Sequence, residues 1–178
     1  MKQAISVIIT MFLTTSIAVA QYKVVPNMPY STLNTAPGFI TINEATYGVG
    51  LSGTTAPFSK QFFGFTSVNG YQVNKNFIFA AGTGLSFYES GLLVPLFLDF
   101  RFSFYIGRLT PYIFGDGGLL INVSDLNNTK LFINPGVGAR YTLSRGIALN
   151  LGAGILSQVD GTVRESFLNL KLGLVYKF

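Results

Sequence analysis

The last twelve residues of the chain, FLNLKLGLVYKF, alternate between two kinds of side chain. One parity is mostly polar or small and includes Asn169, Lys171 and Gly173. The other parity is large and apolar throughout, and it consists of Leu168, Leu170, Leu172, Leu174, Tyr176 and Phe178. Successive side chains of a strand point to opposite sides, so a period of two predicts a β-strand. The two faces of this strand are expected to meet different surroundings.

Seven further stretches alternate in the same way. The eight ranges are roughly 39–51, 61–70, 76–88, 92–104, 109–121, 131–143, 146–157 and 166–178. Each is close to the roughly 9–11 residues that a tilted strand needs to cross a bilayer. In the fourth, Leu96 and Leu98 alternate with Asp99 and Arg101. The second is ambiguous in parity, because it carries two adjacent phenylalanines.

The N-terminus has the pattern of a secretory signal peptide. A single lysine precedes an apolar run, and Ala18-Val19-Ala20 forms a small-x-small cleavage site. We predict a signal peptide over residues 1–20, cleaved after Ala20, rather than an anchor, because the apolar run is short for a membrane span. Residues 21–38 contain prolines and no periodicity, which predicts a flexible periplasmic segment. Residues 39–178 hold the eight alternating stretches and are assigned to one β-barrel. A plug in the mouth of this barrel and a partner-binding segment are the alternatives for residues 21–38.

The composition decides which solvent the apolar faces meet. Charged residues make up only 11% of the chain and hydrophobic residues 49%, whereas soluble domains carry about 25% charged residues. A soluble barrel of the lipocalin kind would need far more charge on its outside. No apolar run of about 20 residues follows residue 20, so we expect no transmembrane helix. We therefore predict an all-β, eight-stranded, antiparallel up-and-down transmembrane barrel with its large apolar face toward lipid and small polar residues in the lumen.

The connections between the predicted strands fall into two groups. With both termini on the periplasmic side, the short periplasmic turns are Gly70–Lys75, Tyr105–Arg108 and Leu143–Gly146. The outer loops are Ser52–Lys60, Tyr88–Gly91, Asn122–Lys130 and Gln158–Glu165, and the last two are interpreted as the longest and most polar. Three prolines lie within or near strands, and a closed barrel has no edge to accommodate them. We predict bulges or strand ends at Pro95, Pro111 and Pro135.

Six charged residues have the parity that faces the lumen. They are Glu44, Asp99, Arg101, Asp116, Arg140 and Lys171. Their positions along the strands predict one belt of three acids and three bases across the lower and middle lumen. Since an unpaired charge in a narrow lumen is costly, we interpret the belt as a paired network that fills and seals the barrel. A charge gate that exchanges partners and passes small ions is the alternative, and the sequence leaves the pairing open.

Several functional classes are disfavoured by the residues that the chain lacks. It contains no histidine, which removes the usual general base at neutral pH, so we predict no enzymatic activity. Scattered acids without histidine or cysteine make a poor soft-metal site, and we expect neither a metal nor a cofactor. The net charge of +5 is modest, and the bases are divided between lumen and turns. No basic patch for nucleic acid is therefore predicted.

The barrel region resembles the small eight-stranded outer-membrane proteins of Gram-negative bacteria with the OmpA/OmpX-like architecture, especially the compact barrels of Bacteroidetes. The terminal strand carries the most specific part of this resemblance, through Leu170, Leu172, Leu174, Tyr176 and Phe178. In such proteins this pattern is the signal read by the barrel-assembly machinery. The resemblance implies a location in the bacterial outer membrane, with lipid and the assembly machinery as partners. We expect the barrel to be monomeric.

Three functions remain open at this point. The first is a structural or interaction barrel without catalysis. The second is a small ion or solute channel gated by the charges of the lumen. The third is a surface-binding protein that uses its outer loops, which the shortness of these loops disfavours.

Overall fold

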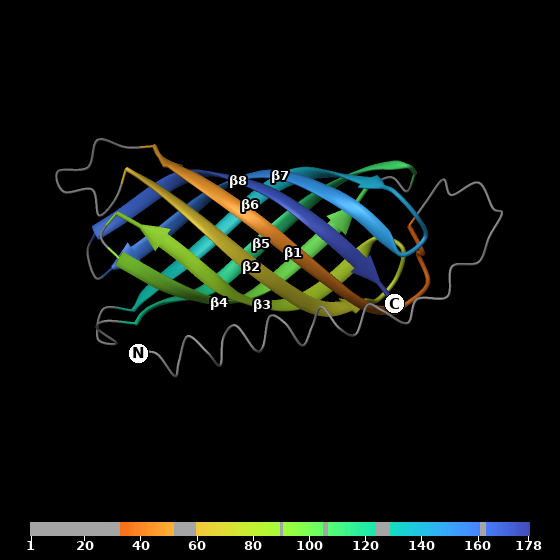
Figure 1. Cartoon of the computed structure of the whole chain (residues 1–178), viewed down its shortest axis with the longest axis horizontal. Helices are drawn as coiled ribbons and strands as arrows, with labels where there is room; N and C mark the ends of the chain where they lie inside the picture. Colours follow the sequence, from red (N-terminus) through yellow and green to blue (C-terminus); the bar gives the residue numbers. More distant parts are fainter. Residues whose placement is uncertain (1–32, 52–59, 90, 105–106, 124–128, 161–162) are drawn as a thin grey trace.

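A computed structural model describes residues 33–51, 60–89, 91–104, 107–123, 129–160 and 163–178 (Figure 1). The predicted signal peptide, most of the predicted flexible segment and the central parts of the first and third outer loops lie outside the described residues. Eight strands follow one another along the chain. They are β1 (Gly38–Gly50), β2 (Gln61–Gln72), β3 (Phe77–Tyr88), β4 (Gly91–Ser103), β5 (Leu109–Asn122), β6 (Lys130–Thr142), β7 (Ile147–Asp160) and β8 (Val163–Lys177).

All eight predicted strands are confirmed, and most of their ends agree within one or two residues. The main error is the connection between β7 and β8. The predicted loop Gln158–Glu165 is wrong, because both strands continue and pair as far as Asp160 and Val163. Only two residues separate these strands. The polar residues of this hairpin suggested a loop, but they belong to the ladder.

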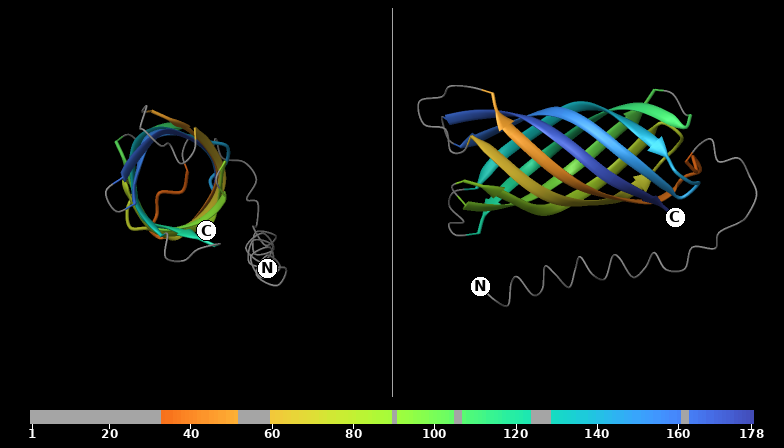
Figure 2. Two further views of the ribbon diagram at one scale, coloured as in Figure 1. Left: turned by 90° about the vertical axis from the view of Figure 1, so that its left-hand side faces the viewer. Right: turned by 45° about the horizontal axis from the view of Figure 1, so that its top comes forward.

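The strands form one closed barrel in which every strand pairs antiparallel with its neighbours, and β8 pairs with β1 (Figures 1 and 2). The stagger follows from one path of paired residues around the barrel. The path runs through Gly38, Gln72, Ile78, Arg101, Phe114, Gly136, Gly154, Asn169 and Gly48. It returns to β1 ten residues further on, so the strands tilt steeply around the axis.

The barrel has two ends that differ in their connections. We call the end with the β2–β3, β4–β5 and β6–β7 connections the turn end, and the opposite end the loop end. The carboxyl terminus lies at the turn end (Figure 1). Residues 33–37 cross the mouth of the barrel there (Figure 2). Leu33 is buried, and the Asn34 amide donates a hydrogen bond to the carbonyl of Arg145 at 2.9 Å.

The prolines correct one prediction. Pro111 lies near the start of β5, as expected, but Pro95 and Pro135 lie inside β4 and β6. The residue pairs on both sides of these two prolines keep the same register, so the predicted bulges are absent from the described ladders. Pairs are missing around Pro95 only on the β3 side and around Pro135 only on the β7 side. Each proline thus loses the pairing that its missing N–H would have made.

The outer wall of the barrel has the apolar character that was predicted for it. The exposed large side chains of the strands are apolar and alternate with buried ones, for example along β4. Glu44, Asp99 and Arg101 are among the buried residues on the inner wall. The second strand also becomes unambiguous, because Phe62 points into the lumen and Phe63 points out. Within the described residues, no helix is long and apolar enough to cross a membrane.

Candidate functional site

The six predicted lumen charges come from five strands and are all buried. Alternation places each of them on the inner wall, and the exposed fraction of each residue is between 1% and 6%. They do not all meet, however. Five of them form one chain of ion pairs, which we call the charge network (Glu44, Asp99, Arg101, Asp116 and Lys171). Arg140 lies apart from it.

Arg101 bridges two acids of the charge network, Asp99 and Glu44. Its Nε and Nη2 atoms donate to the two carboxylate oxygens of Asp99, at 2.9 Å to Oδ1 and 2.8 Å to Oδ2. Its Nη1 atom donates to Glu44 Oε1 at 2.9 Å. The planar guanidinium suits this geometry, because its donors form a fixed fork that matches a carboxylate. One cation therefore joins β4 to β1 across the lumen.

Lys171 extends the charge network toward β5. Its ammonium contacts Asp116 Oδ2 directly and lies 3.5 Å from Glu44 Oε2. Asn134 also donates to Asp116 Oδ2, at 2.9 Å. Glu44 is thus shared by the two cations, Arg101 and Lys171. The network holds three acids against two bases and carries a formal charge of −1.

Arg140 was predicted to belong to the same belt, but it contacts no acid of the network. Its Nε atom donates to Asn150 Oδ1 at 3.0 Å, and its Nη2 atom has no hydrogen-bond partner in the structure. The guanidinium lies 5.5 Å from the centre of the Tyr112 ring, and that of Arg101 lies 5.7 Å from the same centre. The aromatic ring therefore links Arg140 to the network by cation–π contacts rather than by an ion pair.

A second polar cluster, at the loop end, was missed by the sequence analysis. Lys130 lies 3.5 Å from Glu165, and Gln158 donates to Glu165 at 2.6 Å. Tyr88 donates to Gln158 at 3.3 Å. These residues were assigned to outer loops or loop ends, yet they are buried. The signal that would have found them is the lumen-facing parity, which continues unbroken beyond the predicted strand ends.

Between the two polar clusters the lumen is filled with aromatic rings, which the prediction of a small polar interior did not include. We call Phe62, Tyr88, Phe97, Phe132 and Phe167 the aromatic layer. Phe62 stacks on Tyr88 at 4.8 Å between ring centres, and it meets Phe167 edge-on at 5.5 Å. The rings of Phe97 and Phe132 are 5.9 Å apart. Such contacts are favourable beyond the burial of their area.

A small cavity lies between the charge network and the aromatic layer. Its volume is about 30 Å³, and Asp116, Asn134 and Lys171 line it together with Phe97 and Phe132. It accommodates one or two water molecules at most. Four lining oxygens have no hydrogen-bond partner in the structure, namely Thr66 Oγ1, Asp116 Oδ1, Asn134 Oδ1 and Asn169 Oδ1. The cavity is therefore polar enough to hold water but far smaller than a pore.

The chemistry of the site is that of ion pairing. Among the described residues, no group of three or more histidine, cysteine, aspartate or glutamate side chains is placed to hold a metal ion. The predicted assembly residues lie on β8 and just beyond it, with the side chains of Leu170, Leu172, Leu174 and Phe178 exposed on the outer wall. Their role in assembly stays a prediction.

Comparisons with known proteins bear on the fold. No family model matches the chain, and no curated protein matches it. Among solved structures, it is similar to Neisserial surface protein A at 16% identity, over 80% of this chain and 99% of that one, with a TM-score of 0.65.

Two proteins of Pseudomonas aeruginosa are also similar. The outer membrane protein OprG matches at 10% identity over 82% of this chain and 98% of its own, with a TM-score of 0.54. The N-terminal β-barrel domain of OprF matches at 17% identity over 79% and 100%, with a TM-score of 0.50. At these identities the likeness extends to the fold, and this chain has the closed eight-stranded barrel that all three share.

Proposed function

We propose that this protein is an integral barrel of the bacterial outer membrane, with a side-chain-filled lumen and a structural or interaction role without catalysis. The outer wall supports this, because its exposed side chains are apolar over most of the barrel. The fold shared with an outer membrane protein of Pseudomonas aeruginosa also supports it. Export through a signal peptide cleaved after Ala20 belongs to the same proposal.

The observation that carries the proposal is the filling of the lumen. The charge network occupies its middle, and the aromatic layer lies between this network and the loop end. The cavity between them is only about 30 Å³. Because each acid of the network has a cationic partner, these charges occupy the narrow lumen without the large cost of an unpaired buried charge. We therefore expect a barrel that does not conduct.

Planar-bilayer recordings of the mature chain, refolded in lipid, test this expectation. Folding of each sample is checked by the shift of its gel band on heating. The double variant Phe97→Gly and Phe132→Gly removes two rings of the aromatic layer and leaves the charge network in place. The proposal predicts no discrete currents from the folded native barrel, and currents from this variant would show that the aromatic layer rather than the charge network closes the lumen. Discrete currents from the native barrel would contradict a sealed lumen.

A small gated channel is the second candidate, and one contact favours it. Glu44 is shared by Arg101 and Lys171, so its carboxylate could exchange one partner for the other. If native currents are observed, Glu44→Gln should change them. Arg140→Gln is the matched control, because Arg140 has no acidic partner in the charge network. Equal effects of the two variants would exclude this gate.

Two further proposals concern partners. We propose that lipid and the barrel-assembly machinery are the partners, with Leu170, Leu172, Leu174, Tyr176 and Phe178 as the assembly signal. No nucleic acid partner is proposed, because the bases are divided between lumen and turns. Recognition through outer loops is the weakest candidate, since β3–β4 and β7–β8 are each joined by only two residues.

The packing of Leu33 against the turn end supports a plug-like role for residues 33–37.

A further inference from the structure

The outer wall of the barrel is not uniform. Over β4 to β8, outward-facing residues are apolar, aromatic or glycine, apart from Ser157, Arg164 and Ser166 at the loop end of the β7–β8 hairpin. On β1 to β3, five outward positions between the ends carry polar side chains. We call them the polar patch, and they are Thr41, Asn43, Ser67, Asn69 and Thr83. The patch therefore interrupts the apolar wall on one side only.

The register brings the members of the polar patch together, with Asn43, Ser67 and Thr83 near the middle of their strands and Thr41 and Asn69 closer to the turn end. Asn43 pairs with Ser67, Thr41 pairs with Asn69, and Ser67 pairs with Thr83 on the next strand. Within the patch, Thr41 Oγ1 donates to Asn69 Oδ1 at 2.8 Å, and Asn69 Nδ2 donates to Ser67 Oγ at 3.4 Å. The side-chain amide of Asn43 makes no hydrogen bond to any described residue, and Asn43 is exposed.

Such a patch is costly against lipid tails, because they offer no hydrogen-bond partners to an amide or hydroxyl. The cost disappears when another protein surface supplies donors and acceptors at the same depth. Polar side chains are used in this way between membrane-spanning segments. The patch is thus a surface that fits a protein partner better than it fits lipid.

We propose that the partner is a second copy of this chain, and that two barrels pair side by side through the polar patch. The proposal rests on the proposed membrane location of the barrel. Amides and hydroxyls both donate and accept, so the patch is complementary to itself across a twofold axis. It also contains no charged side chain that would repel its copy. The monomer expected from the sequence is replaced by a dimer in this proposal.

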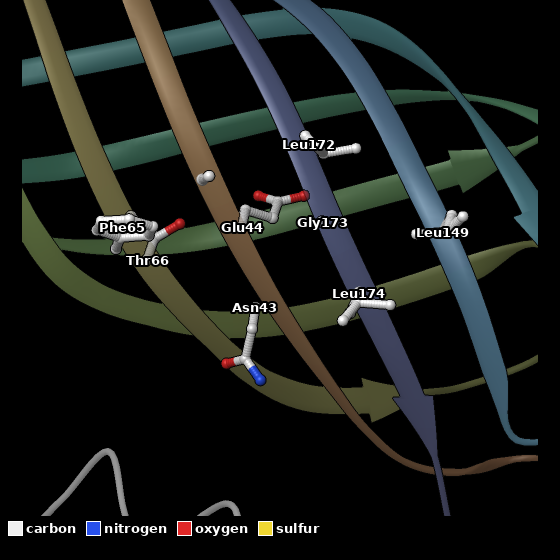
Figure 3. A pocket seen from close by; sticks show the side chains of 9 residues that line it. Asn43, Glu44, Phe65, Thr66, Leu149, Leu172, Gly173 and Leu174 are labelled. Atoms are coloured by element: carbon white, nitrogen blue, oxygen red, sulfur yellow. The ribbon is translucent and has the colours of Figure 1, made fainter.

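The shape of the outer surface next to the polar patch favours the same dimer. An open groove of about 560 Å³ lies over β1, β2, β7 and β8, and Asn43 belongs to it (Figure 3). Figure 3 shows Asn43 between Phe65 of β2 and Leu174 of β8. A twofold axis through the patch places the β8 side of one copy against the β3 side of the other. The β3 side carries Phe79, whose exposed fraction is 53%, and the groove offers an apolar place for such a ring.

Single cysteines provide the test, because the native chain contains none. Ala45→Cys places a thiol on β1 beside the patch, and Ala139→Cys places one on the outer wall of β6. Each variant is refolded in phospholipid vesicles, checked by its heat-dependent gel shift, and treated with a bis-maleimide. We expect cross-linked dimer from Ala45→Cys and at least tenfold less from Ala139→Cys.

A second variant tests whether the polar side chains hold the pair together. Asn43→Leu with Asn69→Leu, in the Ala45→Cys background, removes both amides and leaves a wall that lipid solvates well. We expect a folded barrel with at least a tenfold lower yield of dimer. Equal cross-linking of Ala45→Cys and Ala139→Cys, or an unchanged yield after the leucine substitutions, overturns the proposal. Absence of any heat-shifted band in vesicles would instead count against the membrane barrel itself.

Discussion

The charge network and the aromatic layer fill neighbouring parts of one lumen by opposite means. The charges of the network are held by defined contacts, such as the fork between Arg101 and Asp99. The aromatic layer uses rings that touch at several angles and fill the lumen mainly by their volume. A barrel interior can thus be closed either by pairing or by packing.

The two regions also differ in what they require from the opposite wall. Rings need space, and glycines provide it: an added Cβ at Gly48 would overlap the Phe62 ring, and one at Gly82 would overlap the Phe97 ring. The charge network needs partners on particular strands instead. Its tolerance to substitution should therefore depend on charge, whereas that of the aromatic layer should depend on size.

Arg101→Met is expected to have the largest effect on stability and tests whether the charge network depends on ion pairing. Removing the shared cation leaves Glu44 and Asp99 buried without their main partner, so we expect a loss of about 3–5 kcal/mol in the free energy of unfolding. Arg140→Met is the matched control, because no acid depends on it, and its loss should be about 1 kcal/mol. Denaturant titration of both barrels in lipid vesicles measures this. Equal losses would show that pairing does not distinguish the charge network.

The outer wall provides a reference for both inner regions. Leu172→Arg places a charge against lipid near the middle of β8, and we expect a loss of about 2–4 kcal/mol. Asn150→Ser, a polar change on the inner wall, should cost much less. Denaturant titrations in vesicles compare the two variants. Equal free energies of unfolding would contradict the outward orientation of Leu172.

A substitution with a smaller expected effect tests whether the aromatic layer depends on side-chain size. Gly82→Ala should cost about 1–3 kcal/mol because the methyl group overpacks against Phe97. Adding Phe97→Leu should recover part of this loss. Gly115→Ala is the control, since nothing lies within 4 Å of its added Cβ, and its effect should stay within about 0.5 kcal/mol. A double-mutant cycle on unfolding free energies measures the coupling, and a value near zero would refute the overlap.

The smallest effect on stability is expected at the end of the chain. Deletion of Phe178, which is exposed on the outer wall, should change the free energy of unfolding by less than about 0.5 kcal/mol. The amount of heat-shifted barrel in the outer membrane of cells should nevertheless fall several-fold. Phe39→Ala, an exposed aromatic at the same end, is the control. Normal assembly of the deletion variant would remove the proposed role of this residue.

Alternation was enough to predict the strands, because a slip of one residue would turn every side chain to the wrong wall. It failed where both parities carry similar residues. Phe97 lies between Leu96 and Leu98, so three large apolar residues follow one another. The sequence therefore does not show that Phe97 faces the lumen while its two neighbours face outward. The predicted ends of β7 and β8 were wrong for a different reason. Gln158 and Glu165 are polar, which suggested a loop, but both are buried in the lumen.

The charges of the lumen were predicted from parity, but their pairing was not. Which residues meet across the lumen depends on the stagger of ten residues around the barrel, and this stagger is a property of all eight ladders together. Arg140 illustrates the point. It shares the parity and the approximate depth of the other five charges, but its strand places it beside Asn150 and Tyr112. Arg101 has Asp99 two residues away on the same face of its own strand, whereas Arg140 has Gly138 and Thr142 at the equivalent positions.

The ladder between β1 and β8 has a kinetic consequence. It joins Ile40 to Lys177, so the ring closes only when the earliest and the latest strands of the barrel meet. Contacts between such distant parts of a chain form slowly. Until they form, both strands expose unpaired edges that can add to any neighbouring strand. Closure of the ladder between β1 and β8 is therefore expected to be the slow step of folding, and mispairing at the two open edges is the main hazard until it occurs.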